Sequence, residues 1–422
     1  MRRCERECGG AVSIAGLQTL TLSQHGALMS MKLASAAVFL FGAARLTAQA
    51  PATAYIVTRL GVDTVAIERY TRSGDKLEGD LVLRHPRVRT IHYIADLGPQ
   101  GRIKSFTTTV RRPGTDPSAP PVLRTVSRFG DTLAVVEVQR NGQVDTASSG
   151  RKTYHGAPAP MIGVEPTSYG IYEQLLSAAK LGRDSASYAL IAAGAGPAPA
   201  IILRRHGADS VAFTSTFFPG WTEVASVDSR GRILGIDASA TTVKTVAQRV
   251  TGMDFDNIVK SWAAIETARG GTMGQMSPPD TARATIGGAN LVVAYSRPLK
   301  RGRVIFGNIV PWNQVWRTGA NAATMFTTDK DLVFGSTVVP AGKYTLWTVP
   351  TPTGAKLIFN SETGQWGTDY HADKDFARVD LLGKQVSPSV EQFVIGVTPQ
   401  ASGGLLSFTW DDRQYSVPFT VK

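Results

Sequence analysis

Short runs of alternating apolar and polar residues, separated by turn residues, follow one another from residue 55 to residue 247. Successive side chains of a strand point to opposite faces of a sheet, so this alternation predicts strands with one buried face. Hairpins in succession predict an antiparallel β-meander. The predicted hairpins lie at residues 65–70 with 77–83, at residues 133–139 followed by Asn141-Gly142, and at residues 227–233.

Two stretches instead have the period of an α-helix. Over residues 255–267 the apolar side chains recur every three or four positions, which puts them on one helix face, and Asp254 is placed to cap the first turn. Residues 169–180 have a similar period, with Ser168 as the candidate cap. We therefore expect an antiparallel β-rich domain over residues 51–269 that contains these two helices.

A second β pattern follows a break in periodicity. Residues 270–280 are rich in Gly, Met and Pro and predict a linker. Roughly nine short strands and no helix are predicted beyond it. Many short strands without helices are typical of a β-sandwich or jelly roll, so we expect such a domain over residues 281–422.

The first fifty residues predict a secretory signal peptide. Met31-Lys32 supplies a basic start, residues 33–44 an apolar stretch, and Ala48-Gln49-Ala50 a small-x-small cleavage site. A membrane anchor is the alternative, but the apolar stretch is shorter than the ~20 residues that a bilayer core needs, and Arg45 interrupts it. We expect cleavage after Ala50, export to the periplasm, envelope or medium, and no transmembrane segment afterwards. Residues 1–30 we interpret as preceding the true start codon.

The amino-acid composition limits the classes of binding partner and of chemistry expected for such an exported protein. Of the 422 residues, 43% are hydrophobic and 18% charged, which is ordinary for a globular chain. Cys4 and Cys8 both precede the expected cleavage site, so the mature chain has no disulfide, thiolate metal site or cysteine nucleophile. The net charge of +12 falls to +9 without residues 1–50, and it favours anionic polymers or small anions as partners, although a merely solvated basic surface is the plainer alternative. No basic stripe with interleaved aromatic residues points to nucleic acid.

Motifs for the common enzyme chemistries are missing from the sequence. It contains no His-Glu-x-x-His, no Gly-x-Ser-x-Gly, no phosphate-binding glycine loop and no dinucleotide fingerprint. His85 and His92 would face opposite sides of a continuous strand, which makes them poor joint metal ligands. We expect neither a metal nor a cofactor.

Polar and aromatic residues gather in the C-terminal domain. Residues 295–303 carry four cations without a neighbouring acid. Trp316-Arg317, followed by Asn321, sets a guanidinium near an indole and an amide, a combination able to hold a carboxylate, a phosphate or a hydroxylated ligand. Complementary acids follow Trp366, at Asp369, Asp373 and Asp375. Two interpretations stay equally open, a ligand site and an internal salt-bridge network.

Five of the seven tryptophans lie in the same domain. Trp347 and Trp410 fall within predicted strands and are expected in the core. Trp312, Trp316 and Trp366 fall in turn-rich segments, where an indole is able to stack on a ligand.

A family resemblance rests on motifs spread through residues 278–422. They are Tyr295-Ser-Arg-Pro298, Lys300, Gly302-Arg303, Ile305-Phe-Gly307, Val315-Trp-Arg-Thr-Gly-Ala-Asn321, Pro340-Ala-Gly342, Tyr344, Asn360 and Gly364-Gln-Trp-Gly367. With these motifs the C-terminal part resembles the domain-of-unknown-function family 2911 of exported bacterial proteins. The resemblance implies export and a β-rich domain, but no activity. Residues 51–270 resemble no family that we recognise.

Two positions depart from the pattern of this family. Ala322 stands where the family has an acid after the asparagine, and Ala355 stands where it has a tryptophan. If that acid is catalytic in the family, this chain lacks it.

Three interpretations of different classes follow. The leading one is a non-enzymatic exported or envelope protein whose C-terminal domain binds an anionic or hydroxylated ligand, such as a glycan. The second is a hydrolase with Asp369 or Asp375 as general base and arginines stabilising charge. The third is a structural interaction module. The fold does not choose among the three, because β-sandwiches occur in proteins of all three classes. The residues expected to bind the ligand are Arg297, Arg303, Trp316, Arg317, Asn321, Trp366 and Asp369.

Overall fold

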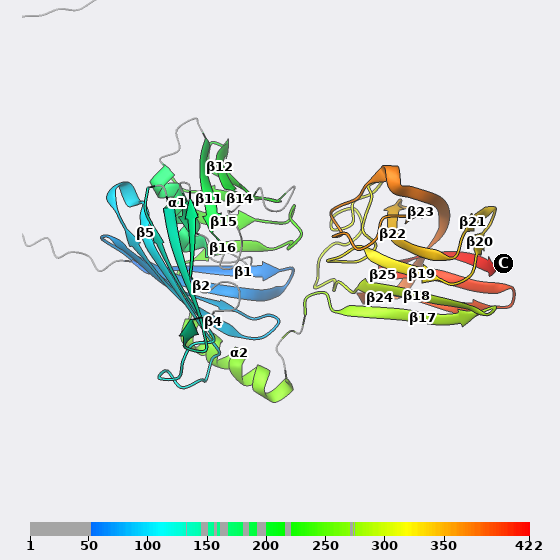
Figure 1. Cartoon of the computed structure of the whole chain (residues 1–422), viewed down its shortest axis with the longest axis horizontal. Helices are drawn as coiled ribbons and strands as arrows, with labels where there is room; N and C mark the ends of the chain where they lie inside the picture. The colour runs from blue at the N-terminus through cyan, green and yellow to red at the C-terminus, as the bar shows by residue number, and fades with distance from the viewer. Residues whose placement is uncertain are drawn as a thin grey trace, which may run out of the picture. The chain divides into compact units, whose positions relative to one another are not determined.

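Buried and exposed side chains alternate along most strands. The structure is mostly β, as the sequence predicts (Figure 1). The computed structural model describes residues 52–422 apart from 132, 145–150, 156–157, 161–167, 180–184, 192–199, 216–220, 271–272 and 274. The predicted signal peptide and the residues before it lie outside the described part. Two large sheets are built from the described residues.

The first sheet is a meander. Its strands are β1 (Ala54–Leu60), β2 (Asp63–Ser73), β3 (Lys76–Leu83), β4 (Arg89–Leu97), β5 (Ile103–Arg111), β6 (Leu123–Phe129), β7 (Leu133–Arg140), β8 (Gln143–Val144), β9 (Arg151–His155), β10 (Pro158–Pro160), β11 (Ser185–Ile191), β12 (Ala200–Gly207), β13 (Ser210–Ser215), β14 (Trp221–Val227), β15 (Ile233–Asp237) and β16 (Val246–Val250), with a short 3₁₀ turn, η1 (Pro99–Gly101), between β4 and β5. Most strands pair with a neighbour in the chain, and β16 pairs with β1, which joins the two runs of the meander. The described pairs are antiparallel, apart from β10 with β11.

The three predicted hairpins are confirmed. β2 pairs with β3, and β14 pairs with β15. Between β7 and β8 the turn residues Asn141 and Gly142 both have positive φ, 49° and 81°. Asn-Gly tolerates this conformation at a tight turn, which is why the dipeptide marks the hairpin in the sequence.

The longer predicted helix, α2 (Phe255–Arg269), packs against the first sheet through its apolar stripe. Phe255 and Trp262 are buried against Ile67 of β2. The predicted cap is also present, because the Asp254 side chain accepts the backbone N–H of Asn257.

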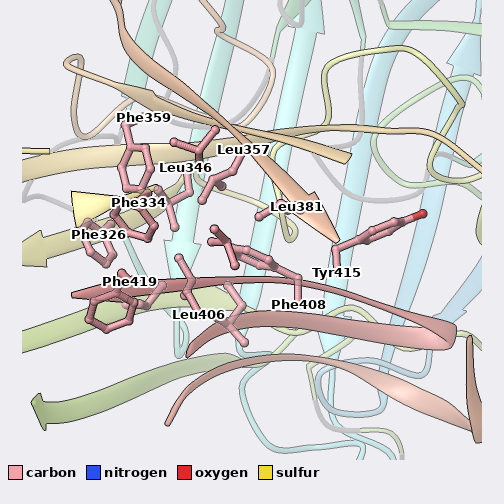
Figure 2. Close-up of a cluster of buried hydrophobic side chains, with 14 of the residues drawn as sticks. Phe326, Phe334, Leu346, Leu357, Phe359, Leu381, Leu406, Phe408, Tyr415 and Phe419 are labelled. Atoms are coloured by element: carbon pink, nitrogen blue, oxygen red, sulfur yellow. The ribbon is translucent and has the colours of Figure 1, made fainter. Parts of the chain in front are cut away.

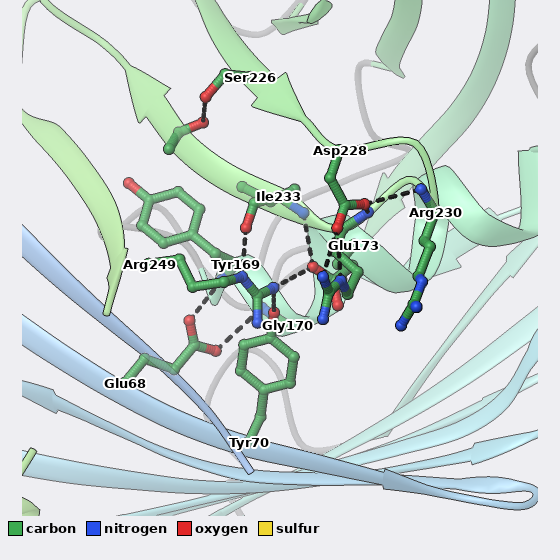
Figure 3. Close-up of polar contacts among 12 residues, drawn as sticks. Glu68, Tyr70, Tyr169, Gly170, Glu173, Ser226, Asp228, Arg230, Ile233 and Arg249 are labelled. Carbon is green, nitrogen blue, oxygen red and sulfur yellow. Dashed lines mark hydrogen bonds and ion pairs between the residues drawn. The ribbon is translucent and has the colours of Figure 1, made fainter. Parts of the chain in front are cut away.

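The other helix, α1 (Tyr169–Ala179), begins where the sequence predicts, with Ser168 at the capping position, where its carbonyl accepts the backbone N–H of Tyr172 at 3.3 Å. The Ser168 hydroxyl, however, donates to the carboxylate of Glu68 on β2. That carboxylate accepts the first free N–H groups, from Tyr169 at 2.8 Å and Gly170 at 3.2 Å (Figure 3), and the Tyr93 hydroxyl at 2.7 Å. These hydrogen bonds and the positive end of the helix dipole favour the ionised carboxylate, but burial is the larger effect and raises the pKa of Glu68.

The second sheet follows α2. Its strands are β17 (Pro279–Ile286), β18 (Ala289–Ser296), β19 (Thr324–Thr328), β20 (Leu332–Phe334), β21 (Thr337–Val339), β22 (Gly342–Pro350), β23 (Gly354–Asn360), β24 (Asp375–Gln400) and β25 (Gly403–Val421), with a 3₁₀ turn, η2 (Ala372–Lys374), before β24. The order is β17-β18-β19-β22-β23-β24-β25-β20-β21. The start of β24 pairs with β23, and β24 pairs with β25 across a register shift between Gln385 and Val394.

The core of this part is aromatic and aliphatic (Figure 2). Phe326 of β19 and Phe359 of β23 are fully buried, and they meet Phe419 and Leu406 of β25 in one cluster. Side chains of β19, β23 and β25, which are not neighbours in the strand order, therefore meet in one core, which gives the sandwich-like packing that the sequence predicts.

Ala50–Lys422 form one compact unit. β17 begins at Pro279, inside the stretch 270–280 predicted as a linker. The division into two domains stays a prediction, which limited proteolysis between Arg269 and Arg283 can test.

Candidate functional site

The segment that carries Arg317 is anchored to the core on one side. The Trp316 indole stacks on Trp410 with ring centroids 6.0 Å apart and packs edge-on against Phe393 at 5.2 Å. Its backbone N–H donates to the Thr348 carbonyl at 2.7 Å. Trp410 and Trp347 are buried core residues, as predicted, and Trp316 is fixed by contact with that core.

The backbone of this segment is strained directly after Arg317. Thr318 is fully buried and has a φ of 52°, a left-handed conformation that a β-branched residue rarely adopts. Two hydrogen bonds hold it there: the Thr324 hydroxyl donates to its carbonyl at 2.7 Å, and its own hydroxyl donates to that of Thr348 at 3.2 Å. Strain of this kind concentrates at functional sites, where the surrounding structure enforces it.

The Arg317 side chain is half-buried and packs closely on the segment that follows Trp366. Gly367 donates its N–H to the Asn321 carbonyl at 2.9 Å. A Cβ at Gly367 would lie 2.5 Å from that carbonyl oxygen and would also meet the Arg317 side chain, so glycine is required. Burial lowers the pKa of the Arg317 guanidinium from its ordinary value.

Five of the seven predicted ligand residues line one pocket with a volume of about 650 Å³. This is the size of a typical small-molecule site. The Trp366 indole is 46% exposed. The Arg303 guanidinium donates to the Lys300 carbonyl at 3.0 Å, and burial followed by repulsion from Arg301 lowers its pKa. The five residues are Arg303, Trp316, Arg317, Asn321 and Trp366.

The other two predicted residues are placed elsewhere. Arg297 forms an ion pair with Asp280 at 3.2 Å and donates to the Phe393 carbonyl at 3.0 Å. Asp369 is exposed and accepts the Thr368 hydroxyl at 3.1 Å. Neither side chain is among the residues that line the pocket.

Ion pairing divides the cations of residues 297–317 into two groups. Lys300 pairs with Asp411 at 2.5 Å, Arg301 pairs with Asp63 of β2, and Arg297 pairs with Asp280. Within the described part of the chain, Arg303 and Arg317 form no ion pair. The salt-bridge interpretation of the sequence therefore applies to the first group only.

The acids predicted to complement these arginines contact other groups instead. Asp375 accepts the Tyr370 hydroxyl at 2.7 Å and the Asn360 amide at 3.0 Å, and it pairs with Arg378 at 2.6 Å. Asp373 lies 3.3 Å from Lys374. Asp375 is thus held in a structural cluster and does not line the pocket.

Lys244 is a pocket residue that sequence reasoning missed. It precedes β16 in the first sheet, and no pattern around it distinguishes it from any other loop lysine. Only the tertiary contact between residues far apart in the chain reveals it. Sequence reasoning also missed Thr318, because its strain lies in a backbone dihedral angle that the residue type does not indicate.

A second polar cluster lies under α1 in the first sheet (Figure 3). Glu173 of α1 pairs with Arg249 of β16, and Arg249 also donates to the Tyr70 hydroxyl and the Ile233 carbonyl, both at 2.6 Å. Together with the Glu68 network, these contacts pin α1 to the sheet. The cluster is built from groups that satisfy one another, which is typical of a structural role.

Nearby, Glu223 of β14 is buried with one carboxylate oxygen that has no hydrogen-bond partner in the described part of the chain. Burial raises the pKa of Glu223 to about 7. This carboxyl therefore changes its protonation near neutral pH.

No group of three or more His, Cys, Asp or Glu side chains in the described ranges is arranged to hold a metal ion. Among the same residues, no helix has both the length and the apolar character needed to span a membrane.

Comparison with known proteins identifies only the C-terminal part. Residues 277–419 match the model of a family described as Protein of unknown function (DUF2911), which confirms the predicted resemblance and its location. No curated protein matches the chain.

Two solved structures are similar to parts of the chain. One is a DUF1089 family protein from Pseudomonas aeruginosa, 12% identical, with 42% of this chain and 90% of that chain covered and a TM-score of 0.31. The other is a beta-barrel-like protein of domain of unknown function DUF1849 from Brucella abortus, 11% identical, with 47% and 94% covered and a TM-score of 0.28.

Proposed function

We propose that this chain is a non-enzymatic binding protein and that the pocket lined by Arg317 takes a small anionic ligand. The observation that carries the proposal is the Arg317 guanidinium, which is half-buried in a pocket and has no acid partner among the described residues. A cation withdrawn from water without a partner loses hydration free energy, which a bound anion restores. The folded chain thus keeps the Arg317 guanidinium partly buried although this burial costs free energy.

The rest of the pocket suits a hydroxylated body attached to the anionic group. The half-exposed indole of Trp366 offers a face on which a sugar ring or another flat group is able to stack. The Thr368 hydroxyl and the Asn321 amide line the same pocket. An acidic glycan is therefore a suitable ligand class.

The hydrolase alternative has less support. Asp369 and Asp375, its two candidate general bases, are not among the residues that line the pocket. A general base must lie within hydrogen-bond reach of the proton it removes. Asp375 is moreover occupied by Tyr370, Asn360 and Arg378.

Isothermal titration of the mature chain, residues 51–422, against organic acids, nucleotides and acidic glycans tests the proposal. Arg317→Gln should abolish binding of any ligand found. The matched control is Arg297→Gln, which removes an arginine paired with Asp280 outside the pocket and should leave the affinity within about twofold. Equal losses in both variants, or no binding by any anion, would contradict the proposal.

We also propose that the chain is exported after removal of its signal peptide. The support is the basic, apolar and small-residue order of residues 31–50. N-terminal sequencing of the protein recovered from the envelope or medium should begin near Pro51. A recovered protein that still begins at Met31 would contradict this.

A further inference from the structure

A third cation reaches the pocket from the first sheet. Lys244 stands just before β16, is half-buried, and has a φ of 57°, which few residues other than glycine or asparagine adopt. Its ammonium group forms no ion pair within the described part of the chain. Burial, then repulsion by Arg317 and by Arg303, lowers its pKa, so the three cations act on one another.

The charge of the pocket lining is entirely of one sign. Among the described residues that line it, Lys244, Arg303 and Arg317 are cationic, and none is an aspartate or glutamate. Other cations nearby, such as Arg301 and Lys300, have carboxylate partners. Glu391 acts electrostatically on Arg303 but does not line the pocket, so the lining itself supplies no counter-charge, and a bound anion relieves the repulsion between its cations.

The three pocket cations, which come from separate chain segments, suit some anionic groups better than others. A carboxylate presents two oxygens in a plane, which one arginine fork satisfies, and it carries one charge. A phosphate monoester presents three oxygens and up to two charges, which separate cations are able to contact from different sides. Here the cations come from three separate chain segments, two with forked guanidinium groups and one with a compact ammonium.

We propose, on the basis of the binding function above, that the anionic group of the ligand is a phosphate monoester held by Arg317, Arg303 and Lys244. The ester-linked body then lies toward Trp366, the exposed indole of the pocket. A sugar phosphate and the lipid phosphatidic acid are both phosphate monoesters and share this chemistry.

Three small anions with the same phenyl ring show whether the pocket recognises the charge or the shape of the anionic group. At pH 8, phenyl phosphate carries two charges, whereas phenyl sulfate and benzoate carry one each. The mature chain should bind phenyl phosphate at least tenfold more tightly than either of the others, as measured by isothermal titration. Lys244→Gln should weaken phenyl phosphate binding about tenfold and leave the thermal melt unchanged. The control is Lys260→Gln, which removes an exposed lysine of α2 and should change nothing.

The outcomes distinguish this inference from the broader proposal. Equal affinity for the three probes, or no effect of Lys244→Gln, would overturn the phosphate assignment and leave anion binding intact. No binding of any probe would overturn both. If phenyl phosphate is preferred, glucose 1-phosphate and vesicles containing phosphatidic acid are compared next. Binding of the first assigns a soluble phosphate ester, and binding of the second a lipid headgroup.

Discussion

Two buried ionisable side chains in this chain have opposite surroundings. Glu68, under helix α1, is 1% exposed and accepts hydrogen bonds from Ser168, Tyr93, Tyr169 and Gly170. Arg317, in the second sheet region, is half-buried and has no hydrogen-bond or ion-pair partner for its guanidinium in the described part of the chain. The fold therefore supplies hydrogen-bond partners to Glu68, whereas the described residues supply none to the Arg317 guanidinium.

This difference helps to distinguish a buried polar group that stabilises the fold from one that binds a ligand. A buried charge with all its partners present becomes necessary to the fold, because removing it strands those partners. A buried charge without partners adds nothing to stability and loses hydration free energy, so its presence in a pocket points to a ligand. The same division runs through residues 297–317, where Arg301 is paired and Arg317 is not.

The largest effect is expected at Glu68. Glu68→Ala leaves two N–H groups and two hydroxyls unpaired beneath α1, so we expect a loss of about 3–5 kcal/mol in the free energy of unfolding. Urea denaturation measures it. Glu68→Gln, which keeps an acceptor, should lose clearly less. A loss below about 1 kcal/mol for the alanine variant would show that the network under α1 does not stabilise the fold.

Glu223 should make stability depend on pH. Its folded pKa of about 7 lies above the ordinary value of 4.5, so its protonated form favours folding. That contribution is full below pH 4.5 and is lost as pH rises through 7, which amounts to about 3 kcal/mol at 1.36 kcal/mol per pKa unit. The stability of wild type relative to Glu223→Gln should therefore fall between pH 5 and pH 8. A difference that stays constant over this range would show that Glu223 is not the titrating group.

Gly367→Ala should damage the pocket more than the fold. The added Cβ meets the Asn321 carbonyl at 2.5 Å and the Arg317 side chain, which must move. We expect about 1–3 kcal/mol of destabilisation and a larger loss of ligand affinity. Gly252→Ala, where the Cβ meets open space, is the matched control and should change neither. Unchanged anion binding by Gly367→Ala would mean that the position of Arg317 is not critical.

Local features of the fold were predictable because local chemistry fixes them. Asn141-Gly142 marks its hairpin through the backbone angles it tolerates, and the stripe through Phe255 and Trp262 marks α2 through its period. The carboxylate at the start of α1 was not predictable, because Glu68 arrives from a strand about a hundred residues earlier.

The candidate site was predictable only in part, for the same reason. Trp316, Arg317 and Trp366 share short turn-rich segments, and the structure brings them to one pocket. Which cation is paired depends on acids from distant strands, such as Asp280 for Arg297. Lys244 enters from the first sheet, so no motif near Arg317 indicates it.

The most direct measurement compares Arg317→Gln with Arg301→Gln in chemical denaturation without ligand. If Arg317 is kept for a ligand, its replacement should change the free energy of unfolding by less than about 1 kcal/mol. Arg301, which is buried and paired with Asp63, should cost about 1–3 kcal/mol, since Asp63 is partly exposed. A loss of about 3–5 kcal/mol on replacing Arg317 would contradict the account and assign this arginine to the scaffold.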